Sequence, residues 1–223
     1  PDRRIVPADA VGTSRLAPLL PTAPYARWAG SVRRPLTPAH QHLLLVWLRT
    51  GSKPRAAAAL GLSAGTVRAR IRELSRLLRA DLEDATVQAH LLLVLRAPAS
   101  AEIPEGETGA APARLETLPD GILDTEAVRA WAHGLVGGLE PHLRIALACW
   151  LDHHARTAPA AAELHVHRTT LSNWLAQCAE HLAQNLGDAT VRAEVHLALR
   201  ATRTGPDDPA ALPRRGGRTY RRL

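Results

Sequence analysis

An internal duplication constrains this chain more than any other feature. The pattern W-A-x6-L-x-P-x5-L-x2-W-L occurs at 28–48 and recurs, offset by 103 residues, at 131–151. After one inserted residue the offset becomes 104, and 16 of the 42 positions in 56–97 are repeated in 160–201. A repeat of this length predicts two copies of one small domain.

The composition predicts that both copies are all-α. Apolar residues make up 46% of the chain, yet there is no Phe, no Met and only two Tyr. Ala, Leu, Arg and Glu favour helices, whereas sheets draw on aromatic and β-branched residues. The Ala, Arg and Pro bias is also typical of a bacterial genome rich in G and C.

The repeat and its flanks divide the chain into five parts. Residues 98–127 are rich in Pro, Gly and acidic side chains, which is typical of a flexible linker. The expected organisation is an N-terminal segment, a first domain, this linker, a second domain and a basic disordered tail, at residues 1–24, 25–97, 98–127, 128–201 and 202–223.

The first copy reads as four helices, at 38–50, 54–60, 64–79 and from Asp84 onward. Gly61 provides a turn and Ser63 an N-cap before the third of them. A short Ala-rich helix, a tight turn and a longer amphipathic helix form a helix-turn-helix. The recognition helices are therefore expected at 64–79 and 168–183.

Charge indicates an anionic partner, with double-stranded DNA as the first candidate. The chain carries a net charge of +7. Residues 36–97 have nine basic and four acidic side chains, whereas residues 139–201 have five and six. The basic surface thus belongs to the first copy and to the two ends of the chain, and it favours nucleic acid.

The two copies share a helix-turn-helix segment, AAALGLSAGTVRARI at 57–71 and AAELHVHRTTL at 161–171, each preceded by the W-A-x6-L segment. With these segments each copy resembles the C-terminal helix-turn-helix domain of PucR-type (CdaR-like) bacterial transcription regulators. This resemblance implies a fold similar to Fis-like helix-turn-helix proteins and a DNA-binding regulator. The copies depart differently from the family pattern. The first copy has Ala64 and Gly65 where the family usually has Arg and Asn. The second copy has Ser172 and Trp174 where the family usually has arginines.

The DNA-contacting residues are expected on the exposed recognition surfaces, because arginine binds guanine and phosphate and asparagine reads adenine. In the first copy they are Ser63, Thr66, Arg68, Arg70, Arg72 and Arg76. In the second copy they are His167, Arg168, Thr170, Ser172 and Asn173. His165 takes the place of the turn glycine and is expected to adopt a positive φ.

Three functional hypotheses stay open. The first is a sequence-specific transcription regulator whose tandem domains mimic a dimer, with a linker too long to fix the spacing of the two half-sites. In the second, only domain 1 binds DNA, and domain 2, with Trp174 exposed, is a dimerisation or protein-interaction module. The third is a nucleoid or partition protein. A homodimer is a further candidate, and an enzyme is not expected.

No cofactor or metal is expected. Asp152, His153 and His154 are adjacent and would not converge on one ion from a helix, and Trp174 is expected to lie at the core edge or in an interface. Cys149 and Cys178 are predicted to be reduced core residues. Without a signal peptide or membrane segment, a cytoplasmic protein is predicted.

The ends of the chain leave two questions open. The first residue is not Met, so either that residue was removed or a sensor domain for an unknown effector precedes this chain. The arginines of 214–218 are either a minor-groove arm or a solubilising tail.

Overall fold

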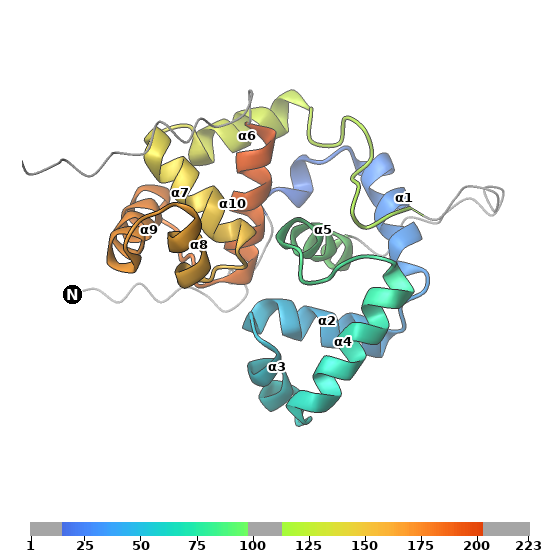
Figure 1. Cartoon of the computed structure of the whole chain (residues 1–223). Coiled ribbons are helices and arrows are strands. Elements are labelled where there is room, and N and C mark those ends of the chain that lie inside the picture. Colours follow the sequence, from blue (N-terminus) through green and yellow to red (C-terminus); the bar gives the residue numbers. More distant parts are fainter. Residues whose placement is uncertain (1–14, 98–112, 203–223) are drawn as a thin grey trace, which may run out of the picture.

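The computed structural model describes residues 15–97 and 113–202, in which helices are the regular elements and no strand occurs (Figure 1). This confirms the all-α prediction. The first copy contains a short 3-10 helix, η1 (Ala17–Leu19), followed by α1 (Thr22–Arg33), α2 (Pro38–Thr50), α3 (Lys53–Leu60), α4 (Ala64–Leu78) and α5 (Ala85–Arg96). The second contains α6 (Glu126–Val136), α7 (Pro141–Asp152), α8 (Thr157–Glu163), α9 (Arg168–Leu182) and α10 (Ala189–Ala201).

Within the described residues each copy therefore has five α-helices, one more than the four expected from the sequence. The additional helices, α1 and α6, carry the first tryptophan of each repeat, Trp28 and Trp131. Helix α1 begins before the expected domain boundary at residue 25, and the buried Leu16 and Leu20 precede it. Within the described part of the chain, no helix is both long and apolar enough to cross a membrane.

Local signals explain where the helices of the first copy begin and end. The side chains of Thr37, Ser52, Ser63 and Asp84 accept hydrogen bonds from the first backbone N–H groups of α2, α3, α4 and α5. Helix α2 ends at Gly51, whose φ of 67° is the left-handed conformation that glycine adopts without a Cβ clash. The starts and stops of these helices follow from the local sequence.

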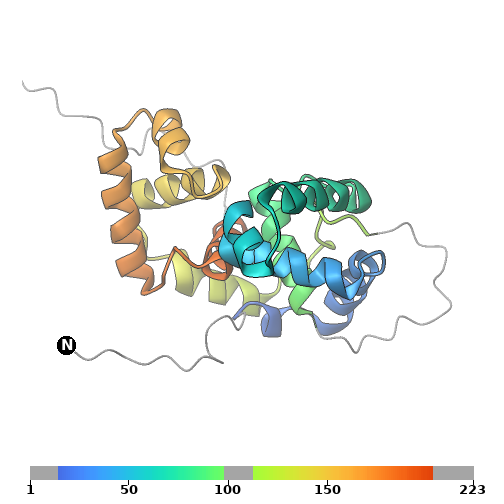
Figure 2. The same cartoon turned by 90° about the horizontal axis from the view of Figure 1, so that it is seen from below.

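Helices α5 and α10 pack against each other at the centre of the molecule (Figures 1 and 2). The segments α2–α4 and α7–α9 lie on either side of this central pair, as both views show. The sequence predicts that Val87, Leu91 and Leu95 of α5 pack inward. Val87 and Leu91 are buried, whereas Leu95 is half-buried. The structure also buries Leu92 and Val94, because α5 packs against α1, α2 and α10.

The contact between α5 and α10 is reciprocal. Arg96 of α5 donates to Oγ1 of Thr190 at 2.8 Å, and Arg200 of α10 donates to Oγ1 of Thr86 at 2.9 Å. Both pairs occupy equivalent positions of the repeat, 104 residues apart. Equivalent residues that exchange the same contact are the mark of an isologous, two-fold interface. The copies are thus related by a pseudo-two-fold arrangement within one chain.

The second half of the expected linker differs from a flexible segment. Leu115 and Ile122 are buried in the core of the first copy. The Leu115 carbonyl accepts a hydrogen bond from Nδ1 of His90 at 2.8 Å, and the Arg114 carbonyl accepts one from Nε1 of Trp28 at 3.3 Å. Apolar side chains between the Pro, Gly and acidic residues, together with these hydrogen bonds, anchor the segment.

The segment that leads into the first copy is held in an equivalent way. The backbone N–H of Arg15 donates to a carboxylate oxygen of Glu194 on α10 at 2.6 Å. Each lead-in segment therefore packs against the last helix of a copy. Because the copies touch directly, their relative position is set by this interface, which corrects the expectation that the linker leaves the spacing free.

Three expectations lie outside the described residues. They concern part of the N-terminal segment at 1–14, the first half of the linker at 98–112, and the tail at 203–223 with its arginine cluster.

Candidate nucleic-acid interface

Helices α3 and α4 form the first helix-turn-helix. Ala56 and Ala57 of α3 are buried, and their small side chains let α4 approach closely. Gly61 turns the chain with φ of 63°, as the sequence predicts. The α4 side chains of Val67, Ile71 and Leu74 are all buried, so the opposite face of this helix is left to solvent.

That solvent face of α4 is basic. Arg68, Arg70, Arg72 and Arg76 are all exposed on this helix, and Glu73 is the acidic residue among them. Guanidinium groups at this spacing can bind guanine edges in the major groove and phosphates on both of its rims. The four arginines singled out from the sequence are thus brought together on one accessible helix.

Ser63 and Thr66 are engaged with each other at the start of α4. The Ser63 Oγ accepts from the Thr66 backbone N–H at 3.0 Å, and the two hydroxyls lie 2.8 Å apart. Ser63 is exposed and Thr66 is half-buried. Both hydroxyls therefore help to cap the helix. A contact with a DNA phosphate would be a second role for them.

Helices α8 and α9 form the second helix-turn-helix, with His165 in the turn at φ of 53°. This confirms the expected positive φ. His167 caps α9, since its Nδ1 accepts from the Thr169 backbone N–H at 3.3 Å. Arg168, Ser172 and Asn173 are exposed on α9, and Thr170 is half-buried.

Trp174 takes the α9 position that Arg70 holds in α4. Its ring is half-buried against the core of the second copy and meets His142 of α7 edge-on, with centroids 5.4 Å apart. This agrees with the expected place at the core edge and corrects the picture of Trp174 as an exposed interface side chain. The described face of α9 carries one arginine, Arg168, against one acidic residue, Glu180.

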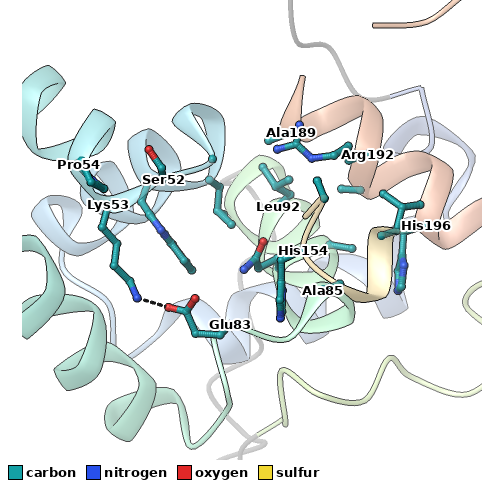
Figure 3. Close-up of a pocket in the computed structure, with 18 of the residues that line it drawn as sticks. Ser52, Lys53, Pro54, Glu83, Ala85, Leu92, His154, Ala189, Arg192 and His196 are labelled. Carbon is teal, nitrogen blue, oxygen red and sulfur yellow. Dashed lines mark ion pairs between the residues drawn. The ribbon is translucent and has the colours of Figure 1, made fainter. Parts of the chain in front are cut away.

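A cavity of about 340 Å³ lies between the two copies (Figure 3). Lys53, which pairs with Glu83, lines it from the first copy, and His154, Arg192 and His196 line it from the second. Arg68 also lines this cavity, so one of the predicted DNA contacts lies where the two copies face each other.

Both cysteines are buried and free, as expected. Burial raises the pKa of the Cys149 thiol to about 12 and that of Cys178 to about 11. The sequence analysis missed that Cys149 and His153 of the α7 end approach Glu163 of α8. The i, i+4 spacing of Cys149 and His153 indicates that these two side chains lie close together. The approach of Glu163 depends on how α7 and α8 pack, which the spacing does not show.

The two helix-turn-helix units, each with a capped second helix and a solvent-exposed face, define a helix-turn-helix DNA-binding protein. The PucR C-terminal helix-turn-helix domain matches the chain twice, at residues 41–97 and 143–201, which together make up just over half of it. The chain belongs to this family, which consists of DNA-binding transcription regulators, and it carries two tandem copies of the domain.

One curated relative is an uncharacterized protein encoded in the pkwA 5' region of Thermomonospora curvata. It is 33% identical over 140 residues, which cover 59% of this chain and 71% of the relative. No solved structure matches the chain.

Proposed function

We propose that this chain is a sequence-specific transcription regulator that contacts double-stranded DNA with both helix-turn-helix units, α4 supplying most of the base contacts. The observation that carries the proposal is the reciprocal α5–α10 contact, which holds two units of one fold as a pair. Most helix-turn-helix proteins reach such a pair by dimerising. Here the duplication supplies it within one chain.

In this proposal α4 lies in the major groove. Arg68, Arg70 and Arg72 read base edges or hold the flanking phosphates, and Arg76 holds a phosphate. Ser63 and Thr66 lie at the helix N-terminus, where backbone N–H groups and the helix dipole favour a phosphate. The five exposed arginines of 68–79 against one acidic residue support this assignment.

Helix α9 makes a smaller contribution. Arg168 and Asn173 are its base or phosphate contacts, supported by His167, Thr170 and Ser172 near its start. These side chains carry less charge than those of α4, so the two units bind unequal half-sites. Because the units are held by a direct interface, their half-sites are separated by one spacing, about 34 Å or a multiple of it.

A second candidate follows from the same asymmetry. Residues 139–201 carry a net charge of −1, and Trp174 replaces a recognition arginine. In this alternative only the first unit binds DNA, and the second unit contributes dimerisation or a protein contact. A third outcome, a nucleoid or partition-type protein, requires binding with little sequence preference and a steep salt dependence.

Two sets of substitutions separate these functions. A high-affinity duplex is first selected from random DNA with the full chain. Its affinity is then compared with that of a random duplex for Arg68→Ala, Arg70→Ala and Arg72→Ala, and for Arg168→Ala and Asn173→Ala. Arg129→Ala, at an exposed position of α6, is the matched control.

Each α4 arginine that reads a base is expected to cost about 1–3 kcal/mol on the selected duplex and less on random DNA. The α9 variants are expected to have smaller but measurable effects. Unchanged binding by the α9 variants favours the single-unit alternative, and equal losses on both duplexes favour the nucleoid alternative. Unchanged affinity of every α4 variant on both duplexes contradicts the assignment of α4.

The partners and location follow the same proposal. A regulator of this kind meets its DNA in the bacterial cytoplasm. A homodimer would bring four helix-turn-helix units together, and gel filtration with light scattering at DNA-binding concentrations tests for it.

A further inference from the structure

Three ligand-bearing side chains meet where the end of α7 packs against α8. Cys149 lies in the last turn of α7, His153 is the residue that follows this helix, and Glu163 is the last residue of α8. The Cys149 sulfur, one imidazole nitrogen and one carboxylate oxygen all lie within 4.8 Å of one another. In the described part of the chain, this is the group of three such residues that converges in this way.

The three side chains differ in their contacts and exposure. Nε2 of His153 lies 2.6 Å from a carboxylate oxygen of Glu163. The Cys149 thiol is 8% exposed and donates to the Ala160 carbonyl at 3.7 Å. Glu163 and His153 are on the solvent side of the thiol, with side chains 64% and 27% exposed. An ion can therefore reach the sulfur from solvent between two adaptable side chains.

We propose that Cys149, His153 and Glu163 bind a divalent transition metal ion, with Zn²⁺ the best match. Thiolate, imidazole and carboxylate are all zinc ligands, at distances of about 2.0–2.3 Å, and together they select against Mg²⁺ and Ca²⁺. Ligand atoms around a tetrahedral zinc lie about 3.3–3.8 Å apart, as those bond lengths require. The His153–Glu163 contact must open slightly, which the exposed Glu163 side chain can do. Binding replaces the thiol proton with the metal, and the proton is released to solvent.

The first copy of the repeat shows that the fold does not need this group. The equivalent positions there are Val46, Thr50 and Ala59, none of which is a metal ligand. The same pair of helices packs in both copies. If no metal binds, the group is an ordinary His153–Glu163 ion pair beside a buried thiol. The first copy, which lacks the three ligands, shows how the same fold packs without a metal.

A metal here would join the end of α7 to the end of α8 across a turn where two residues have positive φ, His154 at 56° and Ala155 at 59°. The inserted residue that changes the repeat offset from 103 to 104 lies in this turn. Three protein ligands leave one position for water or another donor. The site would thus clamp the first helix of the second helix-turn-helix.

Cobalt provides a direct test on the full chain. Co²⁺ is titrated into the reduced protein, and the thiolate-to-cobalt charge-transfer band and the visible bands of tetrahedral cobalt are recorded, followed by displacement with Zn²⁺. The expected result is saturation at one ion per chain. Cys149→Ser is expected to abolish the charge-transfer band, whereas Cys178→Ser, at the other buried cysteine, is expected to keep it.

Glu163→Gln is the second variant, because the Glu163 side chain is exposed and its replacement leaves the packed core unchanged. Losing a residue that only supports a metal ligand weakens metal binding by about 10–100-fold. Glu163 is itself a proposed ligand, so Glu163→Gln is expected to weaken metal binding by more than this. It should also remove most of the rise in melting temperature that Zn²⁺ gives the natural chain. No charge-transfer band in the natural chain, or a band that survives in Cys149→Ser, would overturn the proposal. The readouts do not involve DNA, so they are independent of the proposed function.

Discussion

His90 is a titratable side chain at the junction between the first copy and the lead-in to the second. It is 2% exposed, and its Nδ1–H donates to the Leu115 carbonyl. Its ring also meets Trp28 edge-on at 6.2 Å. Burial lowers the pKa of His90 from 6.5 to about 4, since a charged imidazole would lose its hydration there. His90 is therefore neutral at pH 7.

This shift predicts that the fold weakens in mild acid. Between pH 6.5 and 4 the unfolded chain binds a proton at His90 that the folded chain does not, so the free energy of unfolding falls as the pH drops. The shift from 6.5 to about 4 corresponds to about 3 kcal/mol over that window. Urea unfolding at several pH values should show the loss in the natural chain and a flatter dependence in His90→Gln. The same dependence of stability on pH in the natural chain and in His90→Gln would contradict the prediction. His42→Gln, at an exposed site on α2, is the control.

Among the elements, the turns of the two copies use different residues for the same backbone conformation. Gly51 ends α2 with φ of 67°, and a Cβ there would lie 3.2 Å from the Arg192 guanidinium of the second copy. Gly61 has φ of 63°, and a Cβ there would have no neighbour within 4 Å. The second copy places His165 at the position equivalent to Gly61, with φ of 53°.

Two alanine substitutions should separate backbone strain from contact between the copies. Gly61→Ala is expected to cost about 1 kcal/mol, the price of a left-handed conformation for a residue with a Cβ. Gly51→Ala has the same backbone cost and also displaces Arg192, which donates to the Leu186 and Gly187 carbonyls. Chemical unfolding should therefore give the larger loss for Gly51→Ala. Equal losses would mean that Arg192 moves aside freely.

The sequence predicts the elements better than their contacts. The bounds of α2, α3 and α4 follow from Gly51, Gly61 and Ser63, because caps and turns act over a few residues. The all-round burial of α5 depends on α10, more than ninety residues away, and no local pattern carries it. The arginine face of α4 could likewise be read from helical periodicity, whereas the approach of Glu163 to Cys149 depends on how two helices pack.

Each copy has its own apolar core, and the core of the first copy extends into the second. Leu197 of α10 is 1% exposed and belongs to the apolar cluster of the first copy, together with Leu115, Ile122 and Val128. Helices α5 and α10 would each expose an apolar face if the copies separated. The two domains are therefore expected to depend on each other for stability.

This dependence predicts a single unfolding transition. Calorimetry should give one peak whose calorimetric and van't Hoff enthalpies agree. Leu197→Ala is expected to lower the stability of both copies by about 2–5 kcal/mol, the usual cost of a buried leucine. Leu77→Ala, at a leucine that is 43% exposed, should change little. Two separate peaks, with only one moved by Leu197→Ala, would show that the copies unfold independently.

In the proposed function, two unequal helix-turn-helix units act on DNA as one fixed pair. The spacing of sites in duplexes selected from random DNA by the full chain tests this most directly. The α5–α10 interface predicts two different half-sites at a single separation of about one helical turn or a multiple. The half-site assigned to α4 should change in Arg70→Ala, with the other half-site retained. A lone half-site, or two half-sites at many different separations, would contradict the fixed pair.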